Sequence, residues 1–194
     1  MDALYTAKFG SGTDIRSLGW GSPESQQIRF QVLLDLDGRA DSDRILDVGC
    51  GYGDLSTWVQ AYTGIDIRSH ALREAARRYP GIDVRLATVD TVGEPYDWVV
   101  ASGLFAFAQP EWEDSLVSTV RTMLALATRG VAINLLSART PNKKDPDMMY
   151  ADPDRVLDLL RPLAPRVDLR EGYLVNDLTV YLYPRIESRS SLTA

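Results

Sequence analysis

The sequence predicts an α/β fold, with a mostly parallel sheet that carries helices on both faces. Strand and helix signals alternate through most of the chain, which is typical of βα units. A glycine-rich loop follows the first strand signal, in the stretch ILDVGCGYGDLS at 45–56. Two β-rich runs close the chain, which predicts an antiparallel hairpin beside the parallel block.

Short runs rich in β-branched and apolar residues predict the strands of the parallel block. They lie at 44–48, 62–67, 83–87, 97–102 and 131–136. Between them, apolar residues recur at helical spacing over 71–79 and 112–127, so each of these helices is expected to pack against the sheet. The connection between the glycine loop and the second strand is short, so the first crossover helix should have only about two turns.

Two dipeptides, one Ser-Pro and one Asp-Pro, mark the starts of further helices. Ser22-Pro23 and Asp152-Pro153 each place an N-cap residue before proline at the first helical position, which predicts helices at 23–36 and 153–163. The closing strands are expected at 167–174 and 178–184, joined by a Val-Asn-Asp turn.

No repeat, low-complexity tract or linker divides the chain, which predicts one domain over 1–194. Within it, 1–43 is expected to be a helical segment that covers the ligand site at the glycine loop, and 137–151 is a candidate lid.

Composition limits the class of protein. With 194 residues, 45 % of them hydrophobic and 25 % charged, the chain has the profile of a globular domain. A net charge of −6 disfavours nucleic-acid and membrane partners, and the start of the chain has no leader pattern, so we expect a cytoplasmic protein, either monomer or homodimer. A single cysteine, Cys50, and a single histidine, His70, leave no disulfide and no multi-thiolate or two-imidazole metal site.

The glycine loop and a later acid together indicate a nucleoside site. Gly49, Gly51 and Gly53 can adopt backbone angles closed to other residues, so main-chain N–H groups can approach a ligand. Asp66 ends the second predicted strand, at the same sheet edge as the loop. A carboxylate at this place can accept both hydroxyls of a ribose.

Two acids beside the glycines distinguish between nucleosides. A dinucleotide fingerprint requires a third glycine where this chain has Asp54, and a carboxylate is a poor neighbour for a pyrophosphate. Asp47 adds a second acid before the loop. Carboxylates suit a ligand that carries an ammonium and a sulfonium.

At these residues the chain resembles the class I S-adenosylmethionine-dependent methyltransferases, in particular small bacterial members that act on small molecules. DVGCGYGDL is similar to their first motif, GIDI to their ribose motif, VRLATVD at 84–90 to their adenine-side strand, and YDWVVASGLF at 96–105 to their fourth strand. The resemblance runs from about residue 44 to the end. It implies a Rossmann-like, seven-stranded sheet of order 3-2-1-4-5-7-6, with S-adenosylmethionine as cofactor.

The resemblance also implies a set of cofactor-binding residues. They are Trp20, Arg29, Asp47, Gly49, Cys50, Gly51, Asp54, Leu55, Asp66, Ile67, Asp90, Thr91 and Ser102. Trp20 and Arg29 lie in 18–30, which is similar to the N-terminal segment of small bacterial members, and there Arg29 would pair with the cofactor's carboxylate. The alternative is that Trp20 is a packing residue and Arg29 a cation on the helix surface.

For the acceptor, the predicted reaction is an in-line transfer of a methyl group to an oxygen or nitrogen of a small molecule, in a biosynthetic pathway. Tyr150 in the lid and Asp177 in the hairpin turn are the candidate catalytic residues, to bind or deprotonate the acceptor; alternatively they dock the lid and stabilise the turn. No metal is required. Ser102-Gly103-Leu104-Phe105 lacks the Asn/Asp-Pro-Pro-aromatic pattern of amino-methylating nucleic-acid enzymes, which also argues against a nucleic-acid substrate.

Two other functions remain open at this point. One is an NAD(P)-dependent oxidoreductase, against which Asp54 argues. The other is a degenerate binding module without catalysis, which has no physical need for Gly49, Gly51, Asp66 and Asp90.

Overall fold

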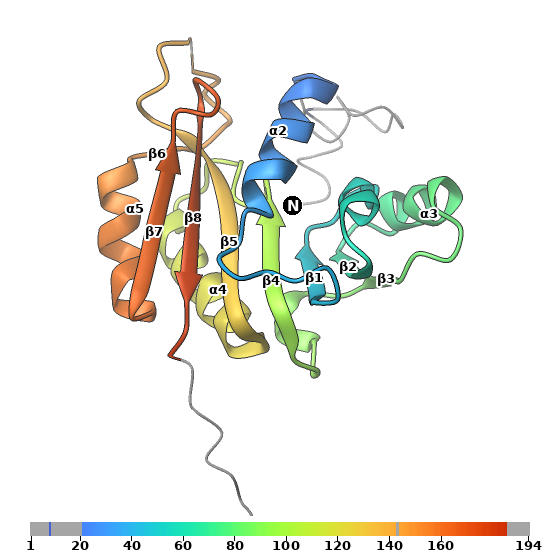
Figure 1. The fold of residues 1–194 in the computed structure, drawn as a ribbon. Coiled ribbons are helices and arrows are strands. Elements are labelled where there is room, and N and C mark those ends of the chain that lie inside the picture. Colours follow the sequence, from blue (N-terminus) through green and yellow to red (C-terminus); the bar gives the residue numbers. More distant parts are fainter. Residues whose placement is uncertain (1–7, 9–20, 143, 186–194) are drawn as a thin grey trace, which may run out of the picture.

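The computed structural model describes residues 8, 21–142 and 144–185, and its centre is one sheet (Figure 1). The strands are β1 (Arg44–Val48), β2 (Ala61–Asp66), β3 (Val84–Leu86), β4 (Tyr96–Ser102), β5 (Ala127–Ser137), β6 (Tyr150–Ala151), β7 (Arg166–Glu171) and β8 (Asp177–Tyr183). Their order is β3-β2-β1-β4-β5-β8-β7, with β6 pairing only with β5. Since β7 and β8 are the sixth and seventh predicted strands, the expected order is confirmed, and β6 is a short addition.

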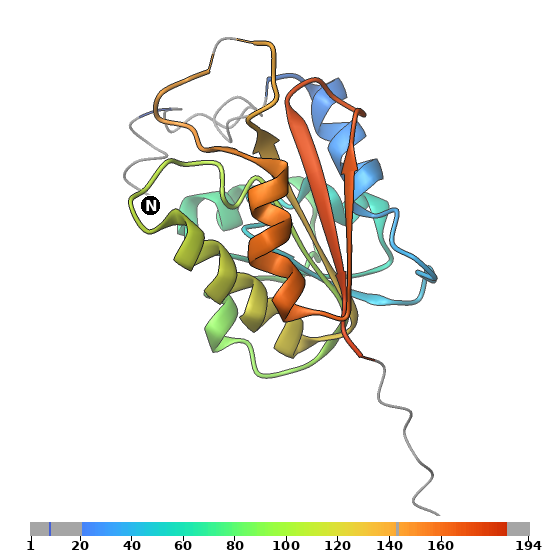
Figure 2. The same cartoon turned by 90° about the vertical axis from the view of Figure 1, so that its left-hand side faces the viewer.

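Helices cover both faces of this sheet. α2 (Pro23–Leu33) packs on β4 and β5 from one side, whereas α4 (Trp112–Leu126) and α5 (Pro153–Leu160) lie on the other side (Figure 2). α3 (Ser69–Arg78) packs on β2 and β3. The apolar side chains form two buried clusters, one on each face, as expected for a sheet buried on both sides.

The predicted helix starts are confirmed. The Ser22 side chain accepts a hydrogen bond from the Ser25 N–H at 3.2 Å, and the Ser25 hydroxyl accepts one from the Ser22 N–H, which completes a capping box. Asp152 accepts from the backbone N–H groups of Asp154 and Arg155. α5 continues as a 3-10 turn, η4 (Arg161–Leu163), to the predicted end at residue 163. α2 ends at Leu33, earlier than the predicted residue 36.

The first crossover is shorter than predicted. Instead of two α-helical turns, the chain forms a 3-10 helix, η2 (Asp54–Trp58), before an extended Val59. A 3-10 helix advances about 2.0 Å per residue against about 1.5 Å in an α-helix, so it returns the chain to the start of β2 with fewer residues. Leu55 from η2 and Phe30 from α2 lie in the same buried cluster, so α2 covers the face that the short crossover leaves open.

The hairpin loop is longer than predicted. β7 ends at Glu171, which pairs with Leu178, and the chain turns at Gly172, whose φ is +83°. The loop thus comprises 172–176, so Asp177 is the first residue of β8 and not part of the turn. Asp177 pairs with Leu136 of β5, and its side chain is only 1 % exposed.

The candidate lid, 137–151, is attached to the body of the sheet. Tyr150 and Ala151 form β6, in parallel register with Leu136 and Ser137 of β5. Two backbone hydrogen bonds, from Met149 to Ala106 and from Ala108 to Asp147, tie it to the loop after β4. A search of the described part of the chain finds no helix of the length and apolarity needed to span a membrane.

Candidate functional site

Two neighbouring cavities open at the carboxyl ends of β1, β2, β4 and β5. The larger has a volume of about 450 Å³ and extends toward α2, the lid and β8. The smaller, of about 290 Å³, extends toward η3 (Val89–Thr91) and α4. Their linings share Gly49, Arg68, Ser102 and Gly103. The site lies where the chain turns from β1 toward β2 on one side and continues through β4 on the other, which is the usual ligand position in such sheets.

The glycine loop adopts the predicted left-handed conformations. The φ angles of Gly49, Gly51 and Gly53 are +77°, +57° and +73°. The loop N–H groups that were expected to approach a ligand donate within the protein, however. Gly49 and Cys50 both donate to the Ile65 carbonyl, at 2.8 and 3.0 Å, because the loop folds back onto the end of β2. The loop therefore gives a ligand close access to backbone without side chains.

Asp66 lies at the end of β2, under the glycine loop, and is 4 % exposed. Its Oδ2 accepts a hydrogen bond from the Gly51 N–H at 2.9 Å, and its Oδ1 accepts one from the Arg68 N–H at 2.8 Å. The Arg68 guanidinium donates to both oxygens, at 3.2 Å each. The acid predicted to bind ribose thus lines the smaller cavity and is bonded to Arg68, which lines both cavities.

Asp47 on β1 is a buried acid in the wall of the larger cavity. Burial raises its pKa to about 7, with a further increase from the nearby charges of Asp66 and Asp54 and an opposing effect of the Tyr62 hydroxyl, which donates to its Oδ2 at 2.9 Å. Near neutral pH this side chain can take up or release a proton. Burial likewise raises the pKa of Cys50 well above its usual range, so the cavity is lined by a neutral thiol.

Gly64 makes room for this cluster. A Cβ atom at Gly64 would lie 2.7 Å from the Tyr62 Oη, 2.8 Å from the Cys50 Sγ and 2.9 Å from the Cys50 Cβ. The Cys50 Cβ cannot rotate out of the way, because it is fixed to the backbone of the glycine loop. The glycine of the GIDI stretch is therefore needed for packing between β2 and the loop.

We expect Gly64→Ala to lower the free energy of unfolding by about 1 to 3 kcal/mol, the usual cost of overpacking a core. The variant is compared with wild type by urea denaturation. Gly93→Ala is the matched control, because a Cβ at Gly93 meets no described atom within 4 Å. Equal stabilities of the two variants would contradict the packing role of Gly64.

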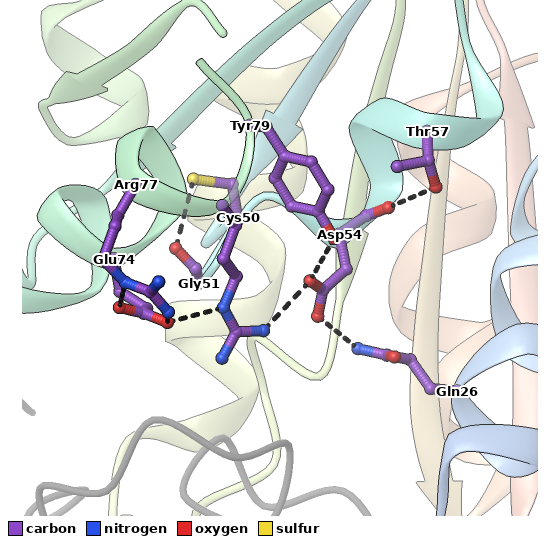
Figure 3. A network of polar contacts seen from close by, with 9 residues as sticks. Gln26, Cys50, Gly51, Asp54, Thr57, Glu74, Arg77 and Tyr79 are labelled. Carbon is purple, nitrogen blue, oxygen red and sulfur yellow. Dashed lines mark hydrogen bonds and ion pairs between the residues drawn. The ribbon is translucent and has the colours of Figure 1, made fainter.

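Asp54, at the start of η2, is held by a network of polar side chains (Figure 3). Its Oδ2 accepts a hydrogen bond from Gln26 of α2 at 3.0 Å, and its Oδ1 accepts one from the Tyr79 hydroxyl at 2.9 Å. Arg78 of α3 pairs with Oδ1 at 3.3 Å and also with Glu74. The network joins α2, η2 and α3 around the larger cavity and fixes the orientation of this acid.

The smaller cavity combines polar and apolar side chains. Asp66, Ile67 and Asp90 line it from the β2 side and from η3, and Leu104 and Phe105 line it from the loop after β4. Ser102 reaches both cavities and accepts a hydrogen bond from the buried Asn134 amide at 3.1 Å.

Three of the predicted cofactor residues are placed elsewhere or are not placed. Leu55 is 1 % exposed within the core cluster on the α2 face and lines neither cavity. Thr91 points its hydroxyl at the Thr88 carbonyl at the surface and lines neither cavity. Both adjoin predicted site residues in sequence, but the local turn directs their side chains away. Trp20 lies outside the described residues.

Arg29 and Asp177 meet in the wall of the larger cavity. The Arg29 Nε lies 2.7 Å from one Asp177 carboxylate oxygen and Nη2 lies 2.7 Å from the other. The interpretation of Arg29 as a cation on the helix surface is wrong, because its side chain is only 13 % exposed and pairs with Asp177 in the wall of the larger cavity. Burial raises the pKa of Asp177, although the charge of Arg29 opposes this rise.

The lid contributes Tyr150 to the same cavity, 27 residues before Asp177 in the sequence. The Tyr150 hydroxyl accepts a hydrogen bond from the Asp145 N–H at 3.2 Å, which is a contact within the candidate lid. Lys8 pairs with Asp145 at 2.8 Å and with Asp147 at 2.7 Å, so a residue near the start of the chain contacts the lid.

The structure adds site residues that sequence patterns missed. Arg68, Tyr62, Gln26 and Asn134 each hold a predicted acid or a cavity-lining group in place. The sequence position of Tyr62 is one signal that could have found it. Tyr62 lies two residues before Gly64, which pairs with Asp47, and so the two residues face the same side of β2. The contacts of Arg68, Gln26 and Asn134 depend on how their elements pack, and no sequence pattern indicates them.

A family model described as a methyltransferase domain matches residues 45–126. The protein named "Putative methyltransferase Rv1506c" of Mycobacterium tuberculosis (strain ATCC 25618 / H37Rv) is 31 % identical over 154 residues, which are 73 % of this chain and 93 % of that protein.

Two solved structures share the fold. The 1,6-didemethyltoxoflavin-N1-methyltransferase of Burkholderia thailandensis, with bound 1,6-didemethyltoxoflavin and S-adenosylhomocysteine, matches with a TM-score of 0.69 at 15 % identity, covering 94 % of this chain and 86 % of that chain. The N-methyltransferase NodS of Bradyrhizobium japonicum WM9, in complex with S-adenosylhomocysteine, matches with a TM-score of 0.66 at 15 % identity, covering 95 % and 98 % of the two chains.

Proposed function

The chain belongs to the methyltransferase domain family, and from this premise we propose that it transfers the methyl group of S-adenosylmethionine to an oxygen or nitrogen of a small-molecule acceptor. Both solved structures described above were crystallised with S-adenosylhomocysteine, and one also with a small-molecule ligand. The net charge of −6 supports a small molecule over a nucleic acid, since phosphates would be repelled. We expect the reaction to serve a biosynthetic pathway.

The observation that carries the proposal is the position of Asp66, which lines the smaller cavity and is bonded to Gly51 of the larger cavity and to Arg68, which lines both. A carboxylate at this place suits a ribose diol, with the base in the smaller cavity and the amino-acid end in the larger one. Asp47 and Asp54 line the larger cavity, where they would attract an ammonium and a sulfonium. In the smaller cavity, Leu104 and Phe105 offer an apolar surface to an adenine and Asp90 an acceptor for its amino group.

Each residue would have a limited task in the reaction. S-adenosylmethionine, when bound, supplies a methyl group that its sulfonium already activates. The chain must align the acceptor with that methyl group and exclude water, and such positioning can contribute about 7 to 11 kcal/mol. The hydrogen bonds that hold Asp66 and Asp54 serve the alignment, whereas α2 and the segment 137–151 serve the exclusion of water.

The acceptor is proposed to bind in the larger cavity, near Asp177 and Tyr150. Arg29 donates one hydrogen bond to each Asp177 oxygen, so each oxygen keeps a lone pair that can accept a hydrogen bond or a proton from the acceptor. Its raised pKa brings Asp177 closer to the range of a general base. Arg29 is then a positioning residue, and Tyr150 contacts the acceptor from the opposite wall.

Isothermal titration calorimetry tests the proposal. We expect S-adenosylhomocysteine to bind with a dissociation constant in the micromolar range, on the order of −8 kcal/mol, and NAD not to bind. Binding of NAD alone would indicate the oxidoreductase function, and binding of neither would leave a module without cofactor. Acceptor classes are then screened by adding S-adenosylmethionine with an amine, a phenol or an alcohol and measuring the S-adenosylhomocysteine formed as the acceptor is methylated, with Asp177→Asn in parallel.

The affinity for S-adenosylhomocysteine should rise about tenfold between about pH 6 and pH 8, because Asp47, whose pKa is about 7, must ionise to attract the ligand's ammonium. The stability of the free protein changes in the opposite direction. A pKa raised on folding means that the folded protein holds the proton more tightly, so the free energy of unfolding falls as pH rises toward 7.

Calorimetry at several pH values measures the first effect. Asp47→Asn keeps the size of the side chain and cannot ionise, so its affinity should be nearly independent of pH in this range. An equally steep pH dependence in the variant would assign the titration to another group.

A further inference from the structure

Arg68 follows Asp66 by two residues and lies at the boundary of the two cavities. It is 7 % exposed, and it belongs to the lining of both cavities. Its backbone N–H and its guanidinium both bind the Asp66 carboxylate. The side chain is thus folded back onto the acid proposed to hold the ribose.

The hydrogen bonds to Asp66 fill the carboxylate. Oδ1 accepts from the Arg68 N–H and Nε, and Oδ2 accepts from the Gly51 N–H and the Arg68 Nη2. A carboxylate has about four lone-pair sites, two on each oxygen, so the described residues already occupy all of them. A ribose diol needs two of these sites. It can bind only if two present donors leave.

Only the guanidinium is able to leave. The Gly51 and Arg68 N–H groups belong to backbone that is fixed by the glycine loop and by the start of α3. The Arg68 Nε and Nη2, in contrast, sit on a flexible side chain, and their 3.2 Å hydrogen bonds are longer than the 2.8 and 2.9 Å bonds of the backbone donors.

We propose that the Arg68 guanidinium occupies the ribose-diol position of the free protein and is displaced when the cofactor binds. This inference rests on the proposed function, since it takes Asp66 as the ribose acid. Arg68 then sets the affinity for the cofactor: only the fraction of molecules in which the side chain has left Asp66 is competent to bind.

The position of Arg68 at the start of α3 supports this role. Arg68 is the N-cap residue, and its side chain caps none of the helix N–H groups. Ser, Thr, Asp or Asn is preferred at an N-cap, and a cation near a helix N-terminus is unfavourable. A residue that breaks a local rule calls for a compensating interaction, and its ion pair with Asp66 at 3.2 Å is that interaction.

The test compares S-adenosylhomocysteine binding by wild type, Arg68→Met and Arg73→Met in calorimetry. If about a tenth of the wild-type molecules are open, Arg68→Met should bind about tenfold more tightly. Arg73 is an exposed arginine of the same helix whose guanidinium reaches Ser69, so Arg73→Met should bind like wild type. Unchanged or weaker binding by Arg68→Met would overturn the proposal.

Adding Arg68→Met to a protein without the Asp66 carboxylate tests whether Arg68 and the cofactor compete for Asp66. In Asp66→Ala, which has no carboxylate to occupy, adding Arg68→Met should leave the affinity unchanged. An equal gain in both backgrounds would contradict displacement from Asp66. Absence of S-adenosylhomocysteine binding in every form would instead refute the proposed function.

A measurement on wild type makes the test independent of how well the variants fold. The 15N–1H resonance of the Arg68 Nε is assigned by its loss in Arg68→Lys and followed during titration with S-adenosylhomocysteine. We expect it to shift and to exchange faster with water at saturation, since its carboxylate partner is lost. A resonance unchanged in position and exchange rate would overturn the proposal.

Discussion

Arg29→Met is expected to lower the free energy of unfolding by about 3 kcal/mol at pH 8, the largest stability effect that we predict for a single side chain of the site. Its partner, Asp177, has a side chain that is 1 % exposed, and Arg29 contacts both of its carboxylate oxygens. Without Arg29 a buried carboxylate loses its counter-charge. Urea denaturation at constant ionic strength measures the change.

Protonation gives this prediction a pH dependence. Burial already raises the pKa of Asp177, and loss of Arg29 removes the opposing effect, so the pKa rises further in the variant. The cost is therefore largest at high pH, where the carboxylate is charged, and it becomes smaller as pH falls and the group takes up a proton. Stability curves at pH 5 and pH 8 should differ in this direction.

Two controls separate the pair from general effects. Arg29→Met combined with Asp177→Leu replaces the pair by apolar side chains and should restore most of the lost stability. Arg166→Met removes a half-exposed arginine that pairs with Asp37 and Asp168, and should cost no more than about 1 kcal/mol. If Arg29→Met costs no more than Arg166→Met, water solvates Asp177 and the positioning role of Arg29 is lost.

Asp66→Ala should weaken binding of S-adenosylhomocysteine by about 1.5 to 3 kcal/mol, or about 10- to 150-fold, the range of hydrogen bonds to a charged group. The variant removes the acceptor of the ribose hydroxyls and also the group that holds the Gly51 N–H at 2.9 Å. Both losses act on the same end of the cofactor. Calorimetry with the ligand in excess measures the change.

Asp158→Ala is the control for Asp66→Ala, because Asp158 is exposed on α5 and lines neither cavity. It should bind S-adenosylhomocysteine like wild type. Asp66→Asn tests geometry against charge, since it keeps an oxygen acceptor for one hydroxyl and should lose less affinity than Asp66→Ala. Wild-type affinity in Asp66→Ala would place the ribose elsewhere in the cavities.

The sequence by itself determined the strands, two helix starts and the left-handed glycine loop, whereas the strand order was expected from the family resemblance. These features depend on residues close together in the chain: the alternation of apolar runs, the proline after Ser22 and Asp152, and the spacing of Gly49, Gly51 and Asp66. Local backbone preferences and burial periodicity are encoded in such neighbourhoods. The position of Asp66 at the sheet edge followed from topology, because parallel strands end on one side.

Only the tertiary structure decided which side chains meet in the site. Arg29 and Asp177 are 148 positions apart, and their contact depends on how α2 docks on β4 and β5 next to β8. Even neighbours in sequence were undetermined, because the direction of the Arg68 side chain depends on the cavity boundary that the β1 loop and α3 create. Leu55 is buried in the core for the same reason, since the 3-10 turn and the packing of α2 determine the direction of its side chain. Side-chain partners are chosen by packing across elements, and no local pattern carries that information.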